Sequence, residues 1–129
     1  MREAHDLFVA TVEGCFAGFG RTTHFIPPAG APSNVAREGY YVVGMLVDLD
    51  WRRRGVGLAL TRARMAWAFQ RAGEVWFFAN ARNHASLDLR ARVGFVEVTR
   101  DFAFPGVSFD GGVGVLCRAA RQQPSSRPR

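Results

Sequence analysis

The segment Val47–Gly57 constrains the fold more than any other part of this chain. It reads V-D-L-D-W-R-R-R-G-V-G: the end of an apolar strand, a basic loop, and a Gly-x-Gly turn that opens a helix. The first amides of a helix have no backbone partners, and the helix dipole places partial positive charge there. Gly55 and Gly57 carry no Cβ atoms that would hold an anion away from these amides. The segment therefore predicts a strand–loop–helix unit that binds a phosphate or pyrophosphate.

The loop matches neither of the two commonest phosphate-binding patterns. A Walker loop requires a lysine, and the chain contains none. A dinucleotide-binding fingerprint requires a third glycine, where this chain has Leu60. The remaining pattern is R-x-x-G-x-G, formed by Arg52, Gly55 and Gly57. By itself this pattern fits a solvated basic turn at the start of a helix equally well.

A second segment, Asn83–Phe95, repeats the order of buried strand, cap and short helix. It reads N-H-A-S-L-D-L-R-A-R-V-G-F and follows the apolar run Val75–Ala79. Together the two segments resemble the acetyl-CoA-binding motifs of the GNAT superfamily of N-acetyltransferases, which are of the types V-D-P-D-Y-R-G-R-G-I-G and N-x-x-[AS]-x-x-L-Y-x-[KR]-x-G-F. Leu49 stands where proline is usual, and Trp51 where tyrosine or phenylalanine is usual. The resemblance extends over Leu7–Ala119.

The resemblance implies one α/β domain over residues 1–120, with a central mixed sheet that splays where acetyl-CoA enters. Residues 121–129 form a polar, proline-containing tail that we expect to be disordered. In the main helix we expect the stripe Val56, Leu60, Ala63 and Trp67 to be buried, and Arg62, Arg64 and Arg71 to stay solvated or flank the cofactor. Apolar patterning and turn residues predict helices at 55–71 and 85–93, and strands at 7–13, 15–24, 39–48, 75–79, 95–104 and 113–118.

Only Met1–Asp6 precede the first predicted strand. The family's domain begins with a further strand and two helices, which help to cover the sheet and shape the acceptor site. The resemblance therefore implies a domain shortened at its N-terminus, with apolar sheet surface left uncovered. We expect dimerisation, a partner protein or a misplaced start codon to account for the gap. The loop Phe25–Glu38, rich in proline and glycine, is a hypothetical partial substitute.

By resemblance, both motifs would hold the donor acetyl-CoA. Backbone amides from Arg53 to Leu58 would bind the pyrophosphate, and the pantetheine arm would bond to the strand before them. From the residues alone, Asn83 is equally a helix N-cap, and Gly94 suits the position after a helix C-terminus. The predicted cofactor-binding residues are Leu46, Val47, Arg52, Arg53, Arg54, Gly55, Val56, Gly57, Leu58, Asn83, Ser86, Arg90 and Arg92.

The implied reaction is attack of an amine on a thioester, which needs a base for the ammonium and a donor for the departing thiolate. Many family members use a tyrosine as that donor, where this chain has Arg90. An arginine is too weak an acid for this task, so Arg90 would stabilise the thiolate by its charge or grip a phosphate. Ser86 is a substitute donor. Asp48 and Tyr41 are the predicted bases, with Glu38, Asp50, Tyr40 and a water chain as alternatives.

Composition argues against several other classes of protein. Hydrophobic residues make up 48% of the chain and charged residues 22%, as in a soluble globular domain. No apolar run is long enough to span a membrane, and no signal peptide is evident, so we expect a cytoplasmic protein. The histidines lack the spacing of metal ligands, and no metal site is predicted. Cys15 and Cys117 are predicted to be buried, reduced thiols within strands.

The leading interpretation is an acetyl-CoA-dependent N-acetyltransferase that acts on a primary amine and forms a homodimer. The first alternative is a catalytically weak acyl-CoA-binding regulatory protein, which Arg90 and the short N-terminus favour. The second is an arginine-rich nucleic-acid-binding domain, which the net charge of +6 allows but the scattered arginines disfavour. A defective fragment that does not fold alone is the third. Neither the acceptor nor the length of the acyl group is indicated by any pattern in the chain.

Overall fold

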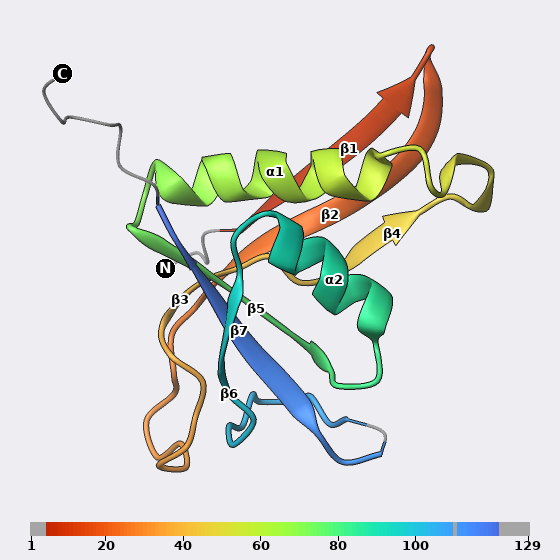
Figure 1. Ribbon diagram of the computed structural model, residues 1–129. Helices are drawn as coiled ribbons and strands as arrows, with labels where there is room; N and C mark the ends of the chain where they lie inside the picture. Colours follow the sequence, from red (N-terminus) through yellow and green to blue (C-terminus); the bar gives the residue numbers. More distant parts are fainter. Residues whose placement is uncertain (1–4, 110, 122–129) are drawn as a thin grey trace, which may run out of the picture.

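The computed structural model describes residues 5–109 and 111–121. Within these residues, one mixed sheet of seven strands carries two α-helices, α1 (Val56–Phe69) and α2 (His84–Arg92), and a short 3₁₀ helix, η1 (Leu49–Trp51) (Figure 1). None of the helices in the described ranges is long and apolar enough to cross a membrane. The strands are β1 (His5–Val12), β2 (Cys15–Phe25), β3 (Gly39–Tyr41), β4 (Met45–Val47), β5 (Glu74–Asn80), β6 (Val96–Thr99) and β7 (Gly114–Ala120).

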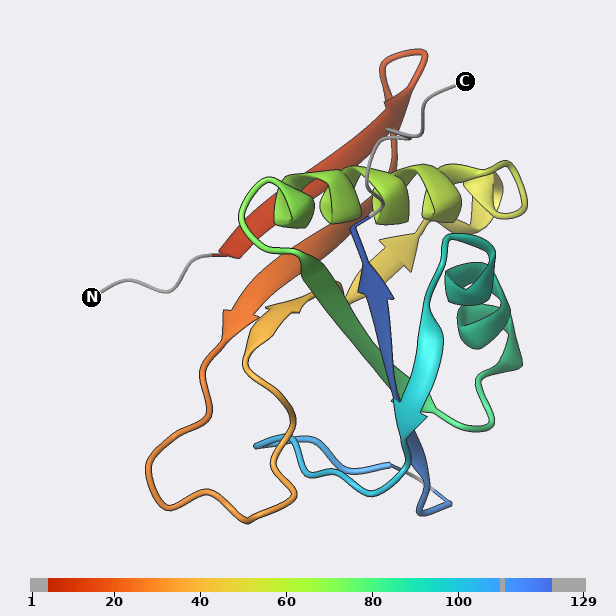
Figure 2. The same ribbon diagram turned by 60° about the vertical axis from the view of Figure 1, so that its left-hand side comes forward.

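The strand order confirms the predicted mixed sheet. It runs β1-β2-β3-β5-β7-β6, and β4 pairs with β2 beside β3. Only β3 and β5 are parallel, and their register consists of one pair, Tyr41 opposite Trp76. Beyond this pair β4 continues along β2, whereas β5 continues along β7. Figures 1 and 2 both show β4 and β5 diverging, with α2 beside the gap between them.

The predicted continuous strand over residues 39–48 is wrong, because the backbone breaks between β3 and β4. Before the break, the amide of Val42 donates to the carbonyl of Trp76 on β5 at 2.9 Å. After it, the carbonyl of Gly44 accepts from the amide of Arg21 on β2 at 3.0 Å. Gly44 has a φ of 75°, which glycine adopts without the steric cost of a Cβ atom. The chain thus changes partner strand at this point, and the change opens the sheet.

The buried face of helix α1 matches the predicted stripe only in part: Val56 and Leu60 are buried as predicted, and Trp67 is partly buried. Arg64 is fully buried, so the expectation that it stays solvated is wrong, whereas Ala63 is exposed. The Arg64 guanidinium donates to the carbonyls of Leu60 at 3.3 Å and Arg21 at 2.8 Å. A Cβ on Gly20 would lie 2.9 Å from the Arg64 Cζ, so this glycine makes room for the guanidinium. The buried residues of α1 are Val56, Leu60, Thr61, Arg64, Met65 and Ala68.

The two faces of the central strands are covered in different ways. Val75, Phe77 and Ala79 of β5 belong to the core cluster that includes residues of α1 and, at its edge, Leu87 of α2. Trp76 and Phe78 point to the opposite face, as the two-residue repeat of a strand requires. There they pack in a second cluster with Phe25 of β2, Tyr41 of β3, Ala36 from the loop over residues 26–38, and Phe102 and Phe104 from the loop over residues 100–109.

These two loops lie together below the sheet (Figure 2). Val35 forms an isolated parallel bridge with Ala103, and the amide of Ala36 donates to the carbonyl of Ala103 at 2.8 Å. The side chain of Asn34 donates to Asp101 at 3.1 Å. The loop over residues 26–38 therefore covers part of this face, which supports its predicted role as a partial substitute for helices.

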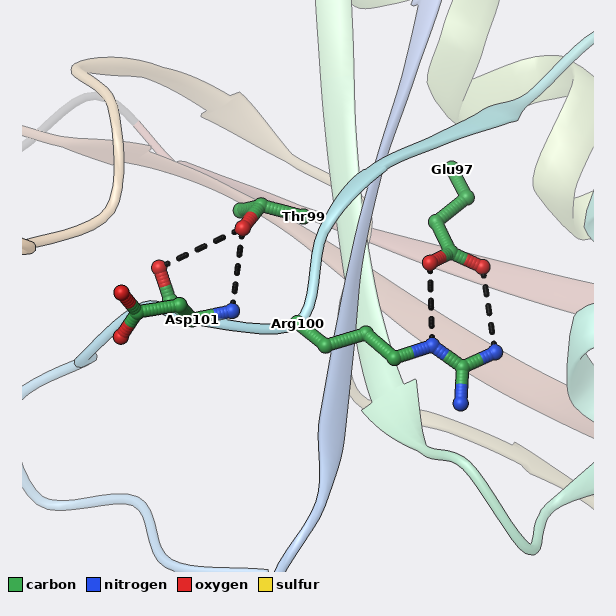
Figure 3. Close-up of polar contacts among 4 residues, drawn as sticks. All are labelled: Glu97, Thr99, Arg100 and Asp101. Carbon is green, nitrogen blue, oxygen red and sulfur yellow. Dashed lines mark hydrogen bonds and ion pairs between the residues drawn. The ribbon is translucent and has the colours of Figure 1, made fainter.

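Side-chain contacts fix the direction in which the chain leaves β6 (Figure 3). Arg100 donates two hydrogen bonds to the carboxylate of Glu97, at 2.9 and 3.2 Å, and thereby lowers the pKa of Glu97. The Thr99 hydroxyl accepts from the amide of Asp101 at 3.0 Å. This turn brings the Asp101 side chain to Asn34 of the other loop. It also ends β6 at Thr99, well before the predicted end at 104.

Several smaller predictions have clear outcomes. Glu13 and Gly14 form the turn between β1 and β2, with φ values of 51° and 81°. Gly94 has a φ of 106° directly after α2, as expected for a residue that ends a helix. Cys117 is buried, but Cys15 is exposed because it lies beside the hairpin turn, so its predicted burial is wrong. Residues 122–129 of the predicted tail lie outside the described residues.

One part of the sheet carries exposed apolar side chains. On the face of β1, β2 and β4 away from α1, Val9 is paired with Phe19, and Phe19 with Leu46. Val9 is 57% exposed and Leu46 48%, and Leu7 and Phe16 beside them are about as exposed. The loops that cover the central strands pack on Tyr41, Trp76 and Phe78 instead. We call Leu7, Val9, Phe16 and Leu46 the open face.

Candidate functional site

A pocket of about 690 Å³ lies where β4, the N-terminus of α1 and helix α2 meet. It is lined by parts of both sequence motifs, which the fold brings together at the point where the sheet splays. The lining residues are Met45, Val47, Arg52, Arg53, Gly55, Gly57, Leu58, Asn83, Ala85, Ser86, Leu89, Arg90 and Arg92. Four of these are arginines, and none of those that the structure describes is acidic.

Glycine is favoured at the two positions of the loop for different structural reasons. Gly55 caps α1 with a φ of 83°, and a Cβ there would meet no atom within 4 Å. Its backbone conformation, rather than lack of space, therefore favours glycine. A Cβ on Gly57 would lie 3.2 Å from the Met45 Cε and 3.4 Å from the Leu89 Cδ1. Gly57 thus allows the first turn of α1, whose first amides have no partners within the helix, to approach both walls of the pocket.

The three consecutive arginines of the loop have three different environments. The Arg52 Nε donates to the carbonyl of Val47 at 3.2 Å and so ties the loop to the end of β4. The Arg54 guanidinium lies 5.2 Å from the centre of the Trp51 ring and does not line the pocket. Arg53 lines the pocket, and its backbone has a φ of 65°.

Helix α2 supplies the other wall of the pocket. The Asn83 side chain accepts from the amide of Ser86 at 3.2 Å, so Asn83 is an N-cap and also a lining residue. Arg90 is only 3% exposed, and its guanidinium lies 4.2 Å from the centre of the Phe77 ring. Its Nη1 donates to the Ser86 hydroxyl at 3.3 Å, and its buried Nε has no hydrogen-bond partner in the described structure.

Burial also sets the protonation of Arg90. Removing the guanidinium from water disfavours its charged form and lowers its pKa to about 10. Arg90 therefore stays protonated at neutral pH. A fixed positive charge thus stands at the pocket wall, where an incoming anion or a developing negative charge would be stabilised.

The predicted catalytic residues separate into two groups. Ser86 and Arg90 line the pocket together. Asp48 does not line it, and its carboxylate accepts from the amide of Asp50 at 3.0 Å as the cap of η1. Tyr41 is fully buried in the aromatic cluster on the other face of the sheet, and its hydroxyl donates to the carbonyl of Arg37 at 2.7 Å. Burial raises the pKa of Tyr41 far above its usual value.

Most of the predicted cofactor-binding residues also line the pocket, but some do not. Leu46 and Val56 do not line the pocket with their side chains, and Leu46 belongs to the open face. Sequence reasoning missed Met45, Ala85 and Leu89. The period of two along β4 places Met45 on the same face as Val47, and the helical period places Leu89 one turn after Ala85. These periods were the available signals.

Comparison with known proteins agrees with this geometry. The model of the acetyltransferase (GNAT) family matches residues 1–95. Comparison with curated proteins gives no match. Among solved structures, the chain is similar to the ribosomal-protein-S18-alanine N-acetyltransferase of Escherichia coli, with a TM-score of 0.66 and 20% identity over 97% of this chain and 74% of that one.

Two further solved structures share the fold. A candidate streptothricin acetyltransferase from Bacillus anthracis, in complex with acetyl coenzyme A, has a TM-score of 0.69 and 20% identity over 90% of this chain and 62% of that one. A nourseothricin acetyltransferase has a TM-score of 0.67 and 24% identity over 92% of this chain and 66% of that one. The chain thus spans about two thirds of the length of these proteins. Because the family model matches most of its residues, the chain belongs to the GNAT family of acetyltransferases, which take their acyl group from acetyl-CoA.

Proposed function

We propose that this protein transfers an acetyl group from acetyl-CoA to a primary amine. The observation that carries the proposal is the pocket at the sheet splay, where a helix N-terminus and four arginines meet and no described lining residue is acidic. Coenzyme A carries three phosphate groups, which such a site suits by charge. The part of the pocket lined by Arg90 and Ser86 is suited to the thioester.

In the reaction, the amine nitrogen attacks the thioester carbonyl carbon. The C–N bond forms, the C–S bond breaks, and sulfur leaves with the electron pair as a thiolate. The fixed charge of Arg90 stabilises this thiolate without transferring a proton to it. The Ser86 hydroxyl, which accepts from Arg90, can turn its own proton toward the sulfur. The proton lost by the amine passes to water, because neither Asp48 nor Tyr41 lines the pocket.

Calorimetric titration of the purified protein with acetyl-CoA tests the donor half of the proposal. We expect saturable one-to-one binding, with much weaker binding of ATP, which lacks the pantetheine arm. The double variant Gly55→Asp, Gly57→Asp places negative charge and bulk at the helix N-terminus and should abolish binding while the thermal transition persists. Unchanged binding by that variant would remove the loop from the donor site.

A second function is favoured by one specific observation. Arg90 occupies the position at which many GNAT enzymes have a tyrosine, and no described lining residue is a carboxylate that would act as a base. A regulatory protein that binds acyl-CoA without turnover fits these features. Incubation with acetyl-CoA and a panel of small amines, peptides and aminoglycosides distinguishes the two functions: release of free thiol above the uncatalysed rate supports the enzyme, and binding without release supports the regulator.

We also propose that the protein forms a homodimer. The support is the open face, whose four apolar side chains lie on one side of β1, β2 and β4. Contiguous exposed apolar side chains on a soluble protein commonly mark an interaction site.

A further inference from the structure

Arg53 has an unusual backbone conformation for an arginine. Among the described residues other than glycine, only Arg53 and Glu13 have a positive φ, at 65° and 51°. A left-handed backbone brings Cβ close to the following carbonyl, so L-residues with side chains rarely adopt it. Glu13 is accounted for by its two-residue hairpin turn with Gly14, which requires a positive φ at both positions. Arg53 belongs to no hairpin, and the related loop motif V-D-P-D-Y-R-G-R-G-I-G has a glycine in its place.

The Arg53 side chain has no structural task that would offset this strain. In the described part of the chain it is exposed and has no hydrogen bond, ion pair or ring contact. Its two neighbours are engaged, since Arg52 bonds to the carbonyl of Val47 and Arg54 lies over Trp51. Arg53 lines the pocket instead. Strained backbone that is kept without a packing reason is typical of binding sites.

We infer that the Arg53 guanidinium is a phosphate-binding group that recognises the 3′-phosphate of coenzyme A; this inference rests on the proposed function. The amides of the first turn of α1, after Gly55, suit the pyrophosphate. Arg53 precedes them in the loop, on the solvent-exposed rim, and Arg92 lines the same pocket from the last turn of α2. A phosphate that lies outside the helix end would therefore have two arginines of the pocket lining as possible partners. The 3′-phosphate is the donor's phosphate that stands apart from the pyrophosphate.

The variant Arg53→Gly separates strain from binding, because the two effects have opposite signs. Without ligand, relief of the left-handed backbone should raise the melting temperature by about 2 °C. Affinity for acetyl-CoA should fall about tenfold, as for the loss of one charged hydrogen-bonded contact. Affinity for 3′-dephospho-acetyl-CoA should equal that of the wild-type protein, because the group that Arg53 recognises is missing. Arg53→Asn, which tolerates the same backbone, should behave alike.

Two matched variants control for charge and for glycine. Arg54→Gly removes an equal charge from the same loop, but from a residue that is outside the pocket and has no positive φ; it should keep the affinity and lower the melting temperature. Glu13→Gly relieves strain away from the pocket and should leave the affinity unchanged. The inference about Arg53 would be overturned, without the proposed function, if Arg53→Gly bound acetyl-CoA with wild-type affinity. It would also be overturned if this variant lost equal affinity for acetyl-CoA and for 3′-dephospho-acetyl-CoA. Absence of acetyl-CoA binding by the wild-type protein would overturn the proposed function and this inference with it.

Discussion

Two buried arginines show how the same residue type serves structure in one place and chemistry in another. Burial lowers the pKa of both Arg64 and Arg90 to about 10, so both stay charged at neutral pH. The Arg64 guanidinium donates hydrogen bonds to carbonyls of α1 and β2 and to the Met45 sulfur, and Arg64 does not line the pocket. Arg90 lines the pocket and keeps one buried N–H without a partner. Of these two arginines only Arg90 has a position from which its charge can stabilise a leaving thiolate.

This difference gives the prediction for Arg90→Met, which keeps most of the side-chain volume and removes the charge. Loss of thiolate stabilisation should lower kcat about a hundredfold, which corresponds to an activation barrier raised by about 2.7 kcal/mol. Removal of an incompletely satisfied buried charge should raise the melting temperature by about 3 °C. Steady-state kinetics with an amine that the wild-type protein acetylates measure the change in kcat, and a thermal melt measures the change in melting temperature. Arg62→Met, on the exposed side of α1, is the control, and an unchanged kcat in Arg90→Met would exclude the electrostatic role.

At the scale of elements, the loop over residues 26–38 is docked onto the sheet through Tyr41. The Tyr41 hydroxyl donates to the Arg37 carbonyl at 2.7 Å, and its ring packs among Phe25, Trp76 and Phe104. Burial raises the pKa of Tyr41 above its unfolded value of about 10. The folded state therefore holds this proton more tightly than the unfolded state. The stabilisation is complete below pH 10 and is lost as the pH rises above it.

Tyr41→Phe tests this account through its dependence on pH. At pH 7 the variant lacks one buried hydrogen bond and should be about 1 kcal/mol less stable than the wild-type protein. Between pH 10 and 11 Tyr41 ionises in the unfolded wild-type protein but stays protonated in the folded one, which lowers the free energy of unfolding, whereas the variant has no such group. The difference in the free energy of unfolding should then shrink. Denaturant titrations at a series of pH values measure it, and a constant difference up to pH 11 would contradict the burial of a titrating hydroxyl.

The elements also show which features are predictable from sequence. Gly55, Asn83 and Gly94 act through backbone conformation or capping within a few residues, so local patterns located the loop, both helices and much of the pocket. The break between β3 and β4 depends on bonds to Trp76 and Arg21, which are distant in the chain. The burial of Arg64 likewise depends on space left by Gly20. Such features follow from tertiary partners, which hydrophobic periodicity does not identify.

At the scale of the whole molecule, the sheet is covered unevenly. Helices α1 and α2 pack on one face, and the two loops pack on the central strands of the other. The open face over β1, β2 and β4 adjoins this loop layer, and the solved structures with the same fold are longer chains, of which this one spans about two thirds. A second copy of the chain is the occupant that we propose, because the face is apolar and carries side chains from three adjacent strands.

Val9→Lys is the substitution that tests the dimer. Val9 lies in the middle of the open face and is 57% exposed, so a lysine there disturbs no packing within one chain. In a two-fold dimer the interface contains the substitution twice. Each copy removes a buried valine side chain and so weakens the free energy of dimerisation by about 1.5 kcal/mol. The dissociation constant should rise more than a hundredfold. Light scattering coupled to size exclusion should find the wild-type protein at twice the 14.3 kDa of one chain and the variant at the single-chain mass.

Val96→Lys, at an equally exposed position on the edge strand β6, should remain dimeric. A wild-type protein that is monomeric at all concentrations, or a Val9→Lys variant that still dimerises, would show that the open face is not a dimer interface.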